Sequence, residues 1–484
     1  MMDMMLLAPE ITMAVTGLAV LLIGLFLPTD SKKILGYLAS LGVLVALGLT
    51  ISSLGTEALL FYNTVSIDAL SQFFKIVFLV VALLFSIAGI KYTEGHSHTE
   101  EFFTLGLFGT IGMMFVASAN DLMVLFVAFE LASLATYALA GFEKKNIKSL
   151  EAAMKYFIIG SLSAALMLLG ISYVYGATGT TSIPEIAANS AVLVSSPIGL
   201  VSVVLLLAGF GFKIALVPFH MWAPDTYQGS PSVVSALLAA GSKKMGIVAA
   251  LKVFVVALIA LKADWQIAFA ILAVITMTYG NVVALRQTSV KRMLAYSSLA
   301  QAGYITMAFV VLTPLALGGG IFYALSHGFM KAGAFIATAA VTYMVLSENK
   351  DSADPDHIEN FRGLGKRMPI TALCMTIFVF ALAGIPVTAG FMSKFILFSS
   401  TIKSGFVWLA VIAILNSAIS LGYYAKIVKY MYFLPTDGEK VSEPFPYTVA
   451  LIIAAVGVLA LGFWSEPFVH WAMEAASVLL TGGM

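Results

Sequence analysis

Long apolar runs, separated by short polar turns, follow one another along nearly the whole chain. A transmembrane helix needs about 20 consecutive, mostly apolar residues, and most of these runs have that length. The pattern therefore predicts an all-α membrane protein of about fourteen spans, near 6–28, 34–54, 67–91, 102–118, 121–140, 151–176, 197–217, 231–260, 266–285, 290–313, 316–346, 370–399, 406–433 and 446–464. A short amphipathic segment is expected at 465–481.

The composition agrees with this pattern. Of the 484 residues, 60% are hydrophobic and 11% are charged, whereas soluble domains carry about 25% charged residues. The net charge of +1 implies no nucleic acid or other strongly charged partner. With Cys374 as the single cysteine, the chain alone makes no iron–sulfur or zinc-thiolate site. Residues 1–28 lack a basic start and a small-residue cleavage site, so we interpret them as a retained span.

Basic residues between the spans are strongly asymmetric. If the N-terminus lies outside, the outer loops carry only Lys262 and Lys403. The inner loops carry Lys32, Lys33, Lys91, Lys144, Lys145, Lys148, Arg286, Lys291, Arg292, Lys350, Arg362, Lys366, Arg367 and Lys440. This distribution follows the positive-inside rule and predicts both termini outside, in a cell membrane.

The remaining basic residues lie inside or at the ends of the predicted spans, and all of them are lysines: Lys75, Lys155, Lys213, Lys243, Lys244, Lys252, Lys331, Lys394, Lys426 and Lys429. A desolvated lysine can lose its proton, whereas arginine effectively cannot. A set of buried lysines therefore favours proton transfer, and a voltage sensor would favour arginine.

Short matches indicate an internal repeat. "AGFGFK" at 208–213 matches "AGFMSK" at 389–394, and "MK" at 154–155 matches "MK" at 330–331. We infer two homologous halves of five helices, and because five is odd the second half is inverted. The predicted units are N-terminal helices 1–101, a first repeat 102–260, a second repeat 261–433 and a C-terminal part 434–484.

A proline accompanies each of the two matched lysines. Pro218 follows Lys213, and Pro386 precedes Lys394. Proline interrupts a helix, and the carbonyl groups it frees need donors that a protonated lysine or water can supply. Each half is therefore expected to contain a broken helix with a polar site inside the bilayer.

Ionisable groups inside a membrane are functional hypotheses by default. Glu130 lies in the middle of a span, where it is expected to partner Lys213, with a static ion pair as the alternative. Together with Lys243 and Lys394, these residues form the predicted proton relay. Lys244 must face away from Lys243 and is expected to pair only locally.

Four further residues are candidates for a secondary relay. His327 and Lys331 are four apart on one helix face, although a packing role for the histidine is an equal alternative. His220 follows the break and is interpreted as a water-linked relay. Lys155 lies nearer the inner end of its span, where it could extend to the interface.

Two other pairs favour structural interpretations. Asp68 and Lys75 are seven apart and are expected to pair on one helix face. His96 and His98 lie in an exposed loop and give little support for a metal site.

Four stretches carry a family resemblance: "FELASLATYAL" (129–139), "GFKIALVPFHMWAPDTYQGSP" (211–231), "SVKRMLAYSSLAQAGY" (289–304) and "LAGIPVTAGFMSKF" (382–395). They resemble the antiporter-like membrane subunits of respiratory complex I and its relatives, most closely the N type (ND2), which includes N subunits of F420H2 dehydrogenase-type complexes.

The resemblance implies fourteen helices with two inverted repeats. It also implies a relay from Glu130 and Lys213 through Lys243 to Lys394, with protons moved by electron transfer in other subunits. Flavin and iron–sulfur clusters would then belong to partner subunits, and this chain would hold no cofactor. Expected partners are the lipid bilayer, other antiporter-like subunits and small K-type and J-type membrane subunits.

One position departs from many of these relatives, which have a histidine where this chain has Gln301. Glutamine cannot titrate, so the central relay is expected to run through water or His327. Two other functions stay open: a subunit of a multi-subunit cation/proton antiporter, and a scaffold in which the lysines only hold helices together.

Overall fold

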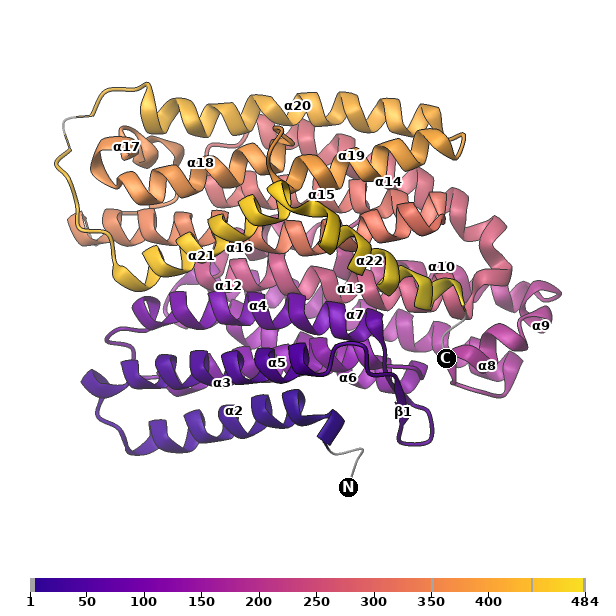
Figure 1. Cartoon of the computed structure of the whole chain (residues 1–484). Helices are drawn as coiled ribbons and strands as arrows, with labels where there is room; N and C mark the ends of the chain where they lie inside the picture. The colour runs from indigo at the N-terminus through magenta and orange to yellow at the C-terminus, as the bar shows by residue number, and fades with distance from the viewer. Residues whose placement is uncertain (1–4, 350–351, 437, 482–484) are drawn as a thin grey trace.

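The computed structural model describes residues 5–349, 352–436 and 438–481, and Lys350 lies outside them. Within the described part, thirteen helices are long and apolar enough to cross a membrane. Two shorter helices placed end to end, α18 (Pro369–Ala383) and α19 (Ala389–Lys403), make a further crossing (Figure 1). The predicted all-α fold of about fourteen spans is confirmed.

The first three spans stand before the repeats. They are α2 (Ala8–Phe26), α3 (Lys33–Ser52) and α4 (Ala69–Tyr92), with the 3-10 turn η1 (Thr29–Ser31) after α2. A small antiparallel hairpin precedes α4, with β1 (Ala58–Leu60) paired to β2 (Val65–Ile67); the hydrophobic pattern gave no sign of it.

The predicted pairing of Asp68 with Lys75 is wrong. The carboxylate of Asp68 accepts a hydrogen bond from the backbone N–H of Ser71 and caps the first turn of α4, where the helix dipole favours a negative charge. Lys75 instead forms an ion pair of 2.7 Å with Glu10 of α2.

Two series of five crossings follow. The first comprises α5 (Thr99–Ser118), α6 (Leu122–Ala140), α7 (Ile147–Thr178), the pair α10 (Pro197–Ile214) and α11 (Trp222–Gly229), and a continuous central helix (Ser232–Ala257). The central helix consists of α12 (Ser232–Leu237), the π-helical turn η2 (Leu238–Ser242), α13 (Lys243–Ala250) and the π-helical turn η3 (Leu251–Ala257). Two short helices that were not predicted, α8 (Ile183–Ala188) and α9 (Ala191–Val194), connect α7 to α10.

After the short turn η4 (Ile259–Leu261), the second series comprises α14 (Lys262–Leu285), α15 (Val290–Val311), α16 (Pro314–Glu348), the pair α18 and α19, and α20 (Val407–Tyr432). The loop before α18 holds η5 (Ile358–Phe361) and α17 (Leu364–Arg367). The described chain closes with α21 (Phe445–Phe463) and the short α22 (Ser465–Leu480), the predicted amphipathic segment.

The bundle has two distinct ends. The hairpin end carries β1, β2, α8 and α9, and the basic end carries α17 together with nearly all of the loop lysines and arginines (Figure 1). The first series starts at the basic end with α5, whereas the second starts at the hairpin end with α14. The two series therefore run in opposite directions, as the predicted inverted repeat requires.

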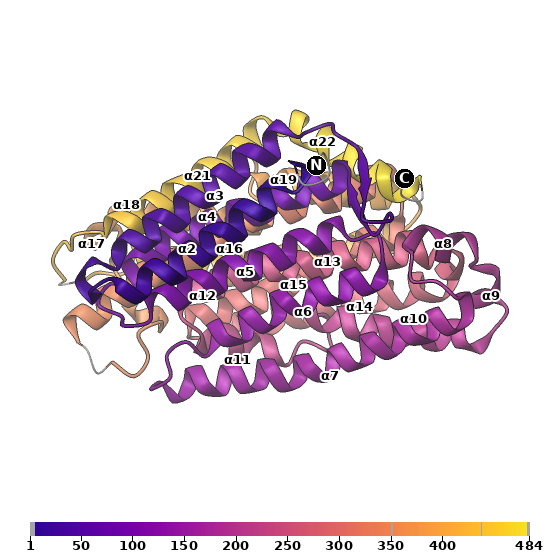
Figure 2. The ribbon, with the colours of Figure 1, turned by 90° about the horizontal axis from the view of Figure 1, so that it is seen from below.

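Burial divides the helices into a core and a shell. Every residue in the most apolar window of the central helix and of α15 is buried, compared with 39% for α7 and α20. In Figure 2, α13 and α15 lie in the middle of the molecule, between the N-terminal helices and α7. The charged residues of the central helix are therefore shielded from lipid.

Both series contain the predicted break in their fourth crossing. α10 ends at Ile214 and Ala215 takes a left-handed conformation (φ 62°); α18 ends at Ala383 and Gly384 does the same (φ 90°). The matched hexapeptides, however, do not occupy equivalent places. Lys213 is in the last turn before its break, whereas Lys394 lies in α19, after its break.

Candidate functional site

Lys213 is completely buried at the end of α10. Its Nζ donates hydrogen bonds to the hydroxyl oxygens of Ser133 on α6 (2.9 Å) and Tyr156 on α7 (3.0 Å). The ring centroids of Phe129 and Tyr137 lie 5.4 and 5.8 Å from the same nitrogen. This cage of hydroxyls and aromatic faces satisfies an ammonium group without a carboxylate in direct contact.

Glu130 lies on α6, three residues before Ser133 and on the same helix face. Its side chain is half-buried, and one carboxylate oxygen, Oε1, is buried with no hydrogen-bond partner in the described residues. The described part of the chain contains no ion pair within 4.0 Å between Glu130 and Lys213, because Lys213 is turned toward the hydroxyls. The expected direct pair is thus not formed in this conformation.

The central helix holds two adjacent lysines that point in different directions. Lys243 donates to the carbonyl oxygen (3.1 Å) and hydroxyl (3.0 Å) of Ser298 on α15. Lys244 donates to the carbonyl oxygen of Ala239 (2.7 Å) and contacts Nδ1 of His327 on α16. The expectation that Lys244 pairs only locally is wrong, since the fully buried helix has a neighbour on every side.

His327 and Lys331 share a face of α16 but have different partners. Lys331 donates to the carbonyl oxygen of Leu294 (2.9 Å) and to the hydroxyl of Ser297 (2.7 Å). Lys243 and Lys331 are therefore held by adjacent serines of α15. Nε2 of His327 is buried without a partner in the described residues, so the ring has a free position for a proton or a water molecule.

Lys394 reaches back across its break. Its Nζ donates to the carbonyl oxygens of Leu382 and Ala383 at the end of α18 and to the hydroxyl of Ser417 on α20, each at 2.9 Å. The break at Pro386 thus frees carbonyl groups that a lysine satisfies, as expected from the sequence. The positive charge also lies at the negative end of the α18 dipole.

Gln301 joins the central lysines to Lys394. Its amide nitrogen donates to the carbonyl oxygen of Leu382 (3.1 Å) and to the hydroxyl of Tyr424 (3.4 Å), and Tyr424 contacts the hydroxyl of Ser297. A continuous line of hydrogen bonds therefore runs from Lys331 through Ser297, Tyr424 and Gln301 to the carbonyl that also binds Lys394. The amide cannot titrate, so it positions this line rather than carrying charge.

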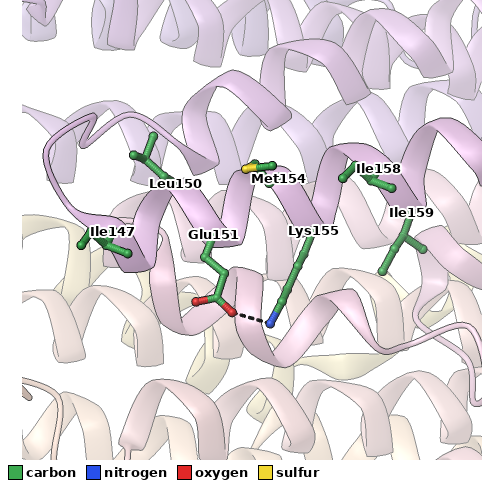
Figure 3. Close-up of a pocket in the computed structure, with 7 residues that line it drawn as sticks. All are labelled: Ile147, Leu150, Glu151, Met154, Lys155, Ile158 and Ile159. Atoms are coloured by element: carbon green, nitrogen blue, oxygen red, sulfur yellow. Dashed lines mark ion pairs between the residues drawn. The ribbon is translucent and has the colours of Figure 1, made fainter.

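The remaining two predicted relay residues lie at the margin of this network. His220 is buried and its ring packs edge-on against Tyr279. Lys155 has a side chain 41% exposed and pairs with Glu151 (2.5 Å) and Asp225 (2.7 Å) at the basic end. It borders a shallow groove of about 460 Å³ along α7, whose lining Figure 3 shows.

Sequence reasoning missed the hydroxyl groups. The predicted relay lysines bind the hydroxyl groups of Ser133, Tyr156, Ser297 and Ser298, and Tyr424 contacts Ser297, yet single hydroxyl residues are common in apolar helices. The only signal was the "YSSL" run at 296–299 inside one of the family stretches. In the described residues, no group of three or more histidine, cysteine, aspartate or glutamate side chains could hold a metal ion.

Comparison with known proteins places the chain in a family. Residues 119–420 match the family described as NADH:quinone oxidoreductase/Mrp antiporter, transmembrane. The chain belongs to this family. It is 69% identical to F(420)H(2) dehydrogenase subunit N of Methanosarcina mazei, over 99% of this chain and all of that protein. This identity confirms the resemblance inferred from the four stretches.

Solved structures agree with the assignment. A chain of respiratory complex I from Thermus thermophilus superimposes with a TM-score of 0.80 at 31% identity, covering 96% of this chain and 98% of that one. A chain of the Mrp complex from Dietzia sp. DQ12-45-1b gives a TM-score of 0.85 at 20% identity, covering 98% and 97%, which shows a shared fold. The same membrane architecture therefore occurs in a chain of respiratory complex I and in a chain of an Mrp complex.

Proposed function

We propose that this chain is the N-type proton-translocating subunit of a membrane complex that oxidises reduced coenzyme F420. The observation that carries the proposal is the line of hydrogen bonds in the second repeat that runs from Lys331 to the carbonyl bound by Lys394. The bonds of Lys243 to Ser298 join the first repeat to it. The 69% identity to a subunit N of an F(420)H(2) dehydrogenase supports the electron donor. Flavin and iron–sulfur clusters belong to partner subunits, beside other antiporter-like, K-type and J-type membrane subunits.

Protons would enter from the basic end, which we place on the inner side of the cell membrane. Both termini then lie on the outer side. A cavity of about 980 Å³ lies at this end, between the α6–α7 loop, α15 and the start of the central helix. Among its lining residues are Glu143, Lys291 and Gln228. Next to Gln228, the ring of Tyr227 lies 5.7 Å from Nζ of Lys243, and its hydroxyl is buried without a partner in the described residues. This hydroxyl offers a step between the cavity and the central lysines.

Charge repulsion would then move the protons outward. Two unit charges about 4 Å apart interact by about 4 kcal/mol at an effective dielectric constant of 20. A proton arriving on one lysine therefore makes a neighbouring ammonium group much more acidic. Glu130, with its unpartnered oxygen, is placed to attract Lys213 and to release it when the charge on the carboxylate changes.

The first test is gentle purification from native membranes followed by mass spectrometry of the co-purifying proteins. We expect flavin and iron–sulfur subunits, and we expect the complex in liposomes to acidify the outer side when it oxidises reduced F420. Lys213→Met should lower this acidification, in an assembled complex, by the share that this subunit translocates. Full acidification by that variant would refute the relay and leave a scaffold role.

A cation/proton antiporter subunit is the alternative, favoured by the shared fold with the Mrp chain. It predicts co-purification with hydrophobic subunits alone and sodium-dependent proton exchange without an electron donor. Either result would displace the redox assignment.

A further inference from the structure

A second cluster of buried charges lies at the hairpin end, outside the relay described above. It contains Lys252 on η3 of the central helix, Asp68 at the start of α4, and the pair of Lys75 with Glu10. Each of these four residues is at most 5% exposed. The cluster joins the first repeat to the N-terminal helices, which lie outside both repeats.

Hydrogen bonds connect Lys252 to Asp68. Nζ of Lys252 donates to the carbonyl oxygen of Ala119 (2.9 Å) and to the hydroxyl of Ser66 (3.4 Å). That hydroxyl in turn donates to Oδ2 of Asp68 at 2.7 Å. A proton donor (the ammonium group), a hydroxyl and a proton acceptor (the carboxylate) therefore stand in order, an arrangement along which a proton can be transferred.

The cluster opens toward the surface at the hairpin end. Ala119 precedes Asn120, whose backbone N–H donates to the carbonyl oxygen of Thr64 and whose side-chain amide donates to that of Asn63, both at 2.9 Å. Asn63, Thr64 and Asn120 line a cavity of about 260 Å³ at this end. The carbonyl bound by Lys252 is thus one residue away from a polar cavity.

The position of Lys252 relates the cluster to the relay. It follows Lys243 by nine residues on the same helix, which is about 13 Å nearer the hairpin end at 1.5 Å per residue. The π-helical turn η2 ends directly before Lys243 and the π-helical turn η3 contains Lys252, and such turns are frequent at functional sites. Structural ion pairs alone would be a costly solution here, because well-packed apolar residues often replace buried charges without loss of stability.

We propose that Lys252, Ser66 and Asp68 form a proton outlet from the central helix to the outer surface, separate from Lys394. In this step the ammonium group of Lys252 gives a proton to the oxygen of Ser66, whose own proton passes to Asp68. The products are a neutral amine and a neutral carboxylic acid, and Asp68 then releases its proton to water at the hairpin end. The inference rests on the proposed function and adds a place of release to it.

The test compares variants in the intact complex, reconstituted in liposomes and driven by reduced F420. Lys252→Met removes the donor and Asp68→Asn removes the acceptor, while asparagine keeps the helix cap. We expect both to lower the number of protons released per donor oxidised to the level of Lys213→Met. Lys32→Met is the matched control, since Lys32 forms a buried ion pair with Glu100 (2.6 Å) at the basic end, and it should leave this ratio unchanged.

An unchanged ratio in assembled Lys252→Met and Asp68→Asn complexes would overturn the outlet. If Lys252→Met fails to assemble, Asp68→Asn and Ser66→Ala decide the question by the same ratio. If Lys213→Met also leaves the ratio unchanged, the proposed function itself fails. If Lys213→Met lowers the ratio but Lys252→Met and Asp68→Asn do not, the outlet is rejected and the proposed function stands.

Discussion

In the two broken helices, different residues donate hydrogen bonds to the carbonyl groups at the break. In the second repeat, Lys394 itself donates to the carbonyl groups that the break frees. In the first repeat, the carbonyl of Phe212 at the end of α10 accepts hydrogen bonds from the indole N–H of Trp222 (2.8 Å) and from the backbone N–H of Ala215 (2.9 Å), and Lys213 binds hydroxyl groups instead. One break is therefore stabilised by the proposed relay lysine itself, whereas the other is stabilised by a tryptophan beside the proposed relay lysine.

From this difference we infer different functions for Lys213 and Lys394. Lys213 is held by groups that can rotate and lies near a carboxylate with an unpartnered oxygen, so it is suited to moving between partners. Lys394 is fixed by two backbone carbonyls at the end of a helix dipole, which stabilises its charged form. We therefore infer that Lys213 switches and that Lys394 holds a proton until the central lysines are loaded.

The largest expected effect is loss of proton translocation in Lys213→Met and in Lys394→Met. A positioned proton donor contributes roughly 10²-fold or more, so the translocation that this subunit supports should fall by at least that factor in both variants. Acidification by the reconstituted complex during oxidation of reduced F420 measures it. If only one variant lost activity, the two halves would not act in series.

Stability should distinguish the two breaks. Lys394→Met removes one donor from each of two carbonyl groups, while Leu382 keeps Gln301 and Ala383 keeps Ser417. Each lost hydrogen bond contributes about 1 kcal/mol, so the variant should lower both the melting temperature and proton translocation. Trp222→Phe removes the corresponding donor of the first break and should lower the melting temperature while translocation continues. The melting temperature and the proton ratio of the same complexes measure both effects.

Trp265→Phe is the matched control for the first break. Its indole N–H donates to the carbonyl oxygen of Leu258 (2.9 Å), away from either break, and it is equally buried. It should destabilise the complex as Trp222→Phe does. Loss of proton translocation in Trp222→Phe but not in Trp265→Phe would show that capping and proton chemistry are joined in the first repeat too.

A smaller effect is expected from the line of hydrogen bonds that joins Lys331 to Lys394 within the second repeat. Tyr424→Phe removes the hydroxyl between Ser297 and Gln301, and a water molecule can partly replace it, so we expect proton translocation to slow severalfold rather than stop. The neighbouring Tyr423→Phe loses its hydrogen bond to Asn281 (2.9 Å) and leaves the hydroxyl of Tyr424 in place, so it should keep the normal rate. If Tyr424→Phe and Tyr423→Phe translocated protons at equal rates, the hydroxyl of Tyr424 would not connect Lys331 to Lys394. His327 would then be the remaining route.

Much of this architecture was readable from the sequence, because the lipid phase restricts the chain to long apolar helices and makes each interruption by proline conspicuous. The breaks near Pro218 and Pro386 and the carbonyl partners of Lys394 followed from that restriction. The partners of Lys213, Lys244 and Lys331 did not, since they depend on which helices meet in three dimensions. The hexapeptide match likewise gave no register: it aligned Lys213 with Lys394, although they lie on opposite sides of their breaks.

The smallest effect is expected from substitution of Lys155, which the "MK" match in the sequence pairs with Lys331. Lys331 is completely buried and binds Ser297, whereas Lys155 is 41% exposed and bound to two carboxylates. Exposed ion pairs contribute about 0.2–1 kcal/mol, so Lys155→Met should shift the melting temperature slightly and leave the proton ratio unchanged, while Lys331→Met should lower that ratio strongly. A large loss in Lys155→Met would mean that the groove along α7 conducts protons and that the two halves are more alike than their buried lysines indicate.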